Sequence, residues 1–90
     1  MADRFVIPEE EIRDVVRGVP DVLGCHHIRT RGSNDFVFLD LHVWMDKDMR
    51  LDEAHRLSHV VKDNLMARFP QIKDAIIHIE PPPRGNANGS

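Results

Sequence analysis

The sequence predicts an α+β fold with the element order α-β-β-α-β, an open-faced sandwich with two helices on one face of a three-stranded sheet. Three observations support this prediction. Residues 36–46 alternate between apolar and mixed positions, as a strand with one buried face does. Residues 8–19 and 51–69 repeat apolar residues at helical spacing. A second alternating stretch, residues 74–80, precedes three consecutive prolines.

The first helix is expected to start at Pro8, because proline suits the first turn and three glutamates follow it at the positive end of the helix dipole. Gly18 and Pro20 end this helix. A strand is then expected from about Leu23 to Arg31, and residues 31–35, RGSND, form a predicted turn.

The clearest strand in the sequence is residues 36–46. Its odd positions are all apolar and should face the core, whereas its even positions carry Phe36, Phe38, Asp40, His42, Trp44 and Asp46.

The second helix should run from about Leu51 to Phe69 and end at Pro70. Its apolar stripe consists of Ala54, Leu57, Val61 and Leu65, and His55 and His59 lie four residues apart at the rim of that stripe. In the last strand, residues 74–79, the alternation places Ala75, Ile77 and Ile79 toward the helices and Ile76, His78 and Glu80 on the other side.

The open face of the predicted sheet is too apolar to meet water alone. An exposed apolar patch on a small domain usually marks a partner surface, and the simplest partner is a second copy of the chain. The residues expected there are Phe36, Phe38, His42, Trp44, Ile76 and His78.

Composition excludes several classes of protein. Ninety residues make one domain, with residues 1–7 as a lead-in, 8–81 as the folded part and 82–90 as a disordered tail. The formal charge is −3 and the basic residues form no run, which argues against a nucleic-acid partner. We find no apolar stretch of the ~20 residues needed to span a bilayer and no signal peptide. The single cysteine, Cys25, fits a reducing compartment and is expected to be a small buried residue.

Histidine is over-represented, with six residues, and three ionisable side chains share the open face of the predicted sheet. These are His42, His78 and Glu80, and imidazole with carboxylate is the ligand set of zinc and its divalent neighbours. A lone histidine on a sheet is more often hydrogen-bonded than a ligand, and spacing alone does not choose the remaining ligands. The candidates to complete the set are His26, His27, His55 and His59.

Four motifs resemble the C-terminal cytoplasmic domain of the cation diffusion facilitator transporters. They are HHIRTR at 26–31, DLHV at 40–43, EAH at 53–55 and HIEP at 78–81, in the order and spacing of that family. The resemblance covers about Pro8 to Pro81 and implies a ferredoxin-like, metallochaperone-like fold that dimerises and binds divalent cations at the dimer interface. It also implies a cytoplasmic location, beneath a membrane domain in full-length transporters, where cation binding brings two copies together.

Carried over residue by residue, the resemblance implies a ligand set of His26, His42, His55, His78 and the bridging carboxylate Glu80, with His27 and His59 as additional candidates. Glu80 stands where several members carry aspartate, and His59 where an acid is frequent. A regular strand would place His26 on the same side as Ile28, toward the core. A ligand role for His26 therefore requires a bulge or a position at the entrance of the strand.

The first hypothesis is therefore a homodimeric, divalent-cation-binding regulatory domain of a cation efflux transporter, with metal binding at the dimer interface favouring the closed dimer. The second is a free cytoplasmic metal-binding or buffering protein with the same ligands. A third, an enzyme that uses His78 and Glu80 as an acid–base pair, is disfavoured because no nucleophile signature or glycine-rich loop is present. The donor set favours Zn²⁺ and also accepts Cd²⁺, Co²⁺, Ni²⁺, Mn²⁺ and Fe²⁺.

Overall fold

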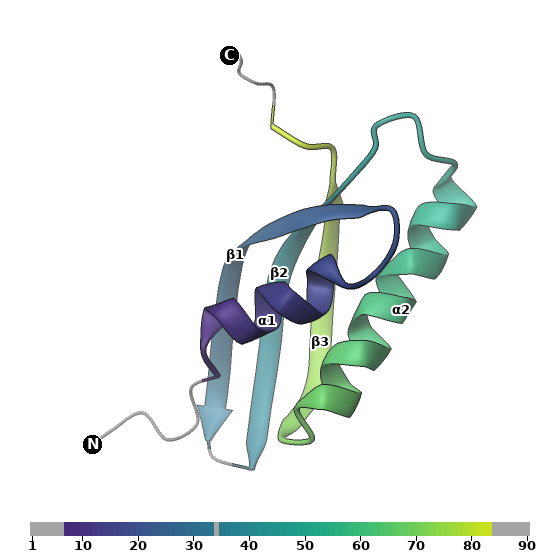
Figure 1. Ribbon diagram of the computed structural model, residues 1–90. Helices are drawn as coiled ribbons and strands as arrows, with labels where there is room; N and C mark the ends of the chain where they lie inside the picture. The colour runs from purple at the N-terminus through teal and green to yellow at the C-terminus, as the bar shows by residue number, and fades with distance from the viewer. Residues whose placement is uncertain (1–6, 34, 84–90) are drawn as a thin grey trace.

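The computed structural model describes residues 7–33 and 35–83 and contains the five predicted elements in the predicted order (Figure 1). They are α1 (Glu9–Arg17), β1 (Val22–Ser33), β2 (Phe36–Met45), α2 (Leu51–Arg68) and β3 (Ile72–Glu80). The fold class is thus confirmed. Most of the predicted lead-in and tail, residues 1–6 and 84–90, lie outside the described residues.

The three strands form one sheet in the order β1-β2-β3, with β2 antiparallel to β1 and parallel to β3. Both helices lie on the same side of the sheet, α1 across the strands and α2 alongside β3 (Figure 1). In the described part of the chain, neither helix combines the length and the apolar character that a membrane span requires.

The core forms between the helices and one face of the sheet, as the alternation in β2 predicts. Every odd position of β2 from Val37 to Met45 is buried. The predicted stripe of α2 is buried against this face, and α1 adds Ile12 and Val16. In β3, Ala75 is buried and Ile77 packs against the core, but Ile79 remains 39% exposed. Ile79 lines an open hollow at the start of α2, where the helix does not cover the end of β3.

A β-bulge interrupts β1 immediately after His26. His26 pairs with His42 and Arg29 pairs with Asp40, so two residues of β1, His27 and Ile28, lie opposite one residue of β2. His27 has a φ of 51°, in the left-handed region. The bulge lets Ile28 pack against the core while His26 faces outward, which is the condition that a ligand role for His26 requires.

The sheet face opposite the helices carries an exposed apolar patch at the end where β1 and β2 are joined. Phe36 is 58% exposed, Phe38 45% and Ile76 50%. Each of these side chains would be covered by a helix in a three-layer fold, but no described element covers them. The predicted open face is therefore present in the single protomer.

Candidate metal centre

Three histidines from three strands form one row across the open face of the sheet. His42 on β2 is the register partner of His26 on β1 and also of His78 on β3. The bulge in β1 and the alternation in β2 and β3 turn all three side chains away from the helices. Glu80 lies two residues after His78, on the same face of β3 and opposite Trp44.

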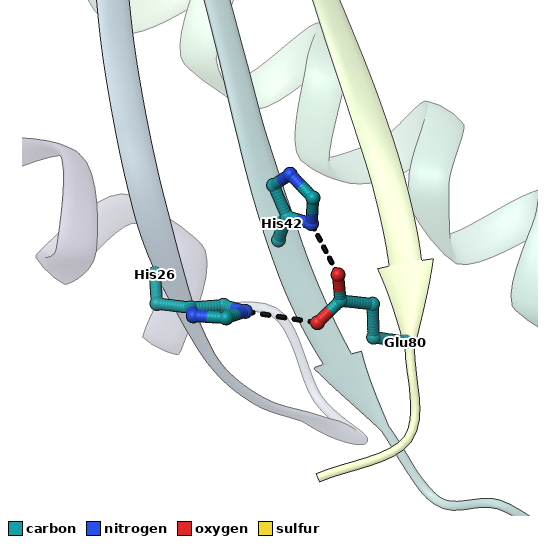
Figure 2. A group of neighbouring side chains, drawn as sticks. All are labelled: His26, His42 and Glu80. Atoms are coloured by element: carbon teal, nitrogen blue, oxygen red, sulfur yellow. Dashed lines mark hydrogen bonds and ion pairs between the residues drawn. The ribbon is translucent and has the colours of Figure 1, made fainter. Parts of the chain in front are cut away.

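The carboxylate of Glu80 joins two of these histidines. Oε1 lies 2.9 Å from Nε2 of His26, and Oε2 contacts Nδ1 of His42. Figure 2 shows the Glu80 side chain extending from β3 across β2, with one oxygen toward each imidazole. One carboxylate thus connects both outer strands of the sheet through side chains that are partly exposed.

A hydrogen bond from His26 and a smaller contribution from the hydrogen bond of His42 hold the pKa of the Glu80 carboxyl below its usual range. The carboxylate is therefore kept ionised, which is the form that binds a cation. The ring of His26 stacks on Trp44 at a centroid distance of 4.7 Å, which restricts the orientation of the imidazole.

A second group of side chains shares His42. Nε2 of His78 lies 3.0 Å from Oδ1 of Asp40, and the rings of His42 and His78 stack at 4.5 Å. Potential ligand atoms of Asp40, His42 and His78 all lie within 4.8 Å of one another. The side chains of His27 and Arg29 line the same hollow.

Sequence reasoning missed the position of Asp40. Asp40 is not among the ligands expected from the sequence, whereas the structure places its carboxylate against His78. The sequence did contain an indication that Asp40 lies near the site, since Asp40 and His42 are two residues apart on one strand and so share a face.

The structure brings together His26, His42, His78 and Glu80, but not His55 or His59. The latter two lie on the exposed side of α2, where their Nε2 atoms are 3.1 Å apart. Within one protomer His55 is not part of either cluster on the sheet. His27 lies beside His26, at a ring distance of 4.2 Å, but it is His26 that contacts Glu80.

Cys25 is buried on the helix side of β1, as predicted for a small core residue. Burial raises the pKa of its thiol, which disfavours the thiolate that a metal would require.

The donors of the sheet clusters fit a divalent transition metal. Two imidazole nitrogens and a carboxylate oxygen lie within 4.8 Å of one another in the cluster of His26, His42 and Glu80. Two ligands of one tetrahedral zinc, at bond lengths of about 2.0–2.1 Å, lie about 3.3 Å apart. The 2.9 Å between His26 and Glu80 is close to this separation, so a small outward movement would admit an ion.

Comparison with known proteins identifies the family of this chain. Residues 7–82 match the family model described as the cytoplasmic domain of cation efflux proteins. The cation-efflux pump FieF of Yersinia pestis (strain Pestoides F) is 41% identical over 78 residues. That match includes 83% of this chain but only 26% of the pump, so the chain spans about a quarter of the length of this relative.

Two solved structures have the same fold at 27% identity. The metal-bound C-terminal domain of the CzcD transporter from Thermotoga maritima superposes with a TM-score of 0.75, over 81% of this chain and 85% of that domain. The cytosolic domain of a cation diffusion facilitator family protein gives a TM-score of 0.74, over 81% and 87% of the two chains. Sequence and structure together establish that this chain belongs to the family of cytoplasmic domains of cation efflux proteins.

Proposed function

We propose that this chain is a homodimeric regulatory domain that senses divalent cations for a cation efflux transporter. The observation that carries the proposal is the convergence of His26, His42 and Glu80 from three strands on the uncovered face of the sheet. The cation, Zn²⁺ or a neighbouring transition metal, would be held on the same face that exposes the apolar patch. Metal binding and association of two copies would therefore involve one surface.

Coordination chemistry gives a reason why metal binding would be coupled to the association of two copies. Zinc usually takes four ligands, and the cluster of one protomer supplies three. An ion held entirely by one protomer would not change the dimer equilibrium, because a ligand shifts an equilibrium only by its differential affinity for the two states. A fourth ligand from the other copy would provide that difference.

The family resemblance implies that His55 is a metal ligand, and we propose that it acts on the sheet site of the other copy. His55 is exposed on α2 and outside both clusters of its own protomer, so it is available to a neighbouring molecule. A shift from about 1% to 99% closed dimer requires roughly 10⁴-fold tighter binding to the closed form. Gain of one imidazole ligand would supply part of this factor. Burial of Phe36, Phe38 and Ile76 would favour the closed dimer with or without the metal, and would therefore lower the factor that the metal must supply.

Sedimentation velocity of the metal-free and zinc-loaded chain tests the proposal. Zinc should raise the dimer fraction, and His55→Ala should reduce this effect while each protomer still binds zinc through the sheet cluster. Asn64→Ala is the matched control, since it truncates an exposed polar side chain of the same helix. If zinc binds with no change in the association state, the chain is a metal-binding or buffering domain without the proposed coupling.

A further inference from the structure

The exposed side of α2 carries a pair of imidazoles that lies outside both sheet clusters of its own protomer. Nε2 of His55 lies 3.1 Å from Nε2 of His59, and the rings meet edge to face at a centroid distance of 4.6 Å. Residues four apart on a helix lie on the same face, one turn above the other. Both side chains are exposed, so an ion can reach them from solvent.

We propose that His55 and His59 form a bis-imidazole chelate that binds one transition-metal ion in the single protomer, separately from the clusters on the sheet. The separation of the two nitrogens is what one ion requires. Two ligands at about 2.0–2.1 Å from a metal lie about 2.9 Å apart at a right angle and about 3.3 Å apart at the tetrahedral angle. The observed 3.1 Å falls between these values, so the two nitrogens already have the spacing that one ion requires, and rotation of the rings would direct both lone pairs at it.

A metal ion can replace the hydrogen bond between His55 and His59, because each imidazole can change its tautomer. Between two neutral rings, one Nε2–H donates to the other Nε2. A metal needs both lone pairs at Nε2, and the donating ring can provide its own by moving its proton to Nδ1. The change is one of tautomer, with no net loss of a proton. Water would occupy the remaining coordination positions, as expected for a solvent-exposed site.

The surrounding charges do not prevent binding. The two cationic side chains closest in sequence are already engaged, Arg56 by Glu53 and Lys62 by Asp74. Asp63 is exposed and lies one turn beyond His59 on the same face of α2, where its charge favours a cation.

The test begins with a chain that lacks the sheet site. His42→Ala combined with Glu80→Gln removes His42 from both sheet clusters and Glu80 from one. Isothermal titration of this variant with zinc should show residual binding of one ion per protomer, independent of protein concentration. Adding His59→Ala should weaken that binding at least about tenfold, since losing even an indirect support of a ligand costs 10–100-fold. Asn64→Ala, an exposed position on the same helix, is the matched control and should have no effect.

A second measurement needs no substitution. In the unaltered chain, zinc should shift the Nε2 resonances of both His55 and His59 in long-range ¹H–¹⁵N spectra. Absence of residual binding in the double variant, residual binding that persists without His59, or an unmoved His59 resonance would each overturn the proposal. Because His59 belongs to neither sheet cluster, failure here leaves the sensor function untouched.

Discussion

Glu80 and His26 stand 54 residues apart in the sequence, yet Oε1 of one lies 2.9 Å from Nε2 of the other. The contact spans the whole width of the sheet, from β3 over β2 to β1. It exists because a bulge turns His26 outward and because the glutamate is long enough to reach across the central strand. Together with His42, this pair makes one face of a small sheet into a set of metal ligands.

The first prediction concerns the carboxylate that joins the cluster. Glu80→Gln keeps the size of the side chain but removes its negative charge and the carboxylate that would bind the metal. The zinc affinity, measured by isothermal titration, should therefore fall by at least about 10–100-fold. Glu53→Gln is the control, since that carboxylate is held by Arg56 on α2 and should be irrelevant to zinc binding. Equal affinities of the Glu80→Gln and Glu53→Gln proteins would exclude Glu80 as a ligand.

The second prediction separates the two adjacent histidines. His26→Ala should weaken zinc binding at the sheet site strongly, because it removes the nitrogen next to Glu80. His27→Asn should change it little, and asparagine tolerates the left-handed conformation found at residue 27. Competition with a chromophoric chelator measures both affinities. A larger loss in His27→Asn than in His26→Ala would reverse the assignment.

The third prediction concerns the end of β1. Gly32 has a φ of 119°, and a Cβ there would lie 1.8 Å from the carbonyl oxygen of Phe36. Gly32→Ala should therefore lower the free energy of unfolding by at least about 1–3 kcal/mol. Gly18→Ala is the matched control, because its Cβ would be 3.4 Å from the nearest atom and its φ is −74°. Urea denaturation followed by circular dichroism should show a loss for Gly32→Ala only.

The fourth prediction is a pH dependence of the metal-free domain. The pKa of Glu80 is lowered in the folded state by hydrogen bonds from His26 and His42. A lowered carboxyl pKa contributes stability above the ordinary glutamate pKa of about 4.3, and this contribution is lost as the pH falls through the lowered value. In the presence of a chelator, the free energy of unfolding should therefore decline on acidification below about pH 4.3. The decline should be shallower for Glu80→Gln, and parallel curves for the two proteins would contradict the assignment.

Particular residues show what could be read from the sequence. The period-2 alternation correctly placed His42 and His78 away from the core, because the pleat of a strand fixes the side of each residue. The bulge after His26 could be anticipated, because a regular strand would place His26 on the same side as Ile28, toward the core, whereas a ligand must face outward. The contact of Asp40 with His78 could not be predicted, because it depends on side-chain rotamers that the alternation of the strands does not determine. Ile79 lies on the side of β3 that the alternation predicts, but its exposure depends on how far α2 extends over β3.

The role of His55 depends on more than one chain. The helical pattern predicted that His55 and His59 share a face, and they do. Whether His55 also approaches the sheet cluster of another copy depends on the arrangement of two molecules, which no pattern within one sequence encodes.

The most direct test of the metal centre is a crystal of the zinc-soaked protein measured at the zinc absorption edge. An anomalous peak should lie on the open face of the sheet, at about 2.0–2.2 Å from nitrogens of His26 and His42 and an oxygen of Glu80. A sheet face without such a peak, in crystals that bind zinc elsewhere, would contradict the assignment of this cluster as the metal site.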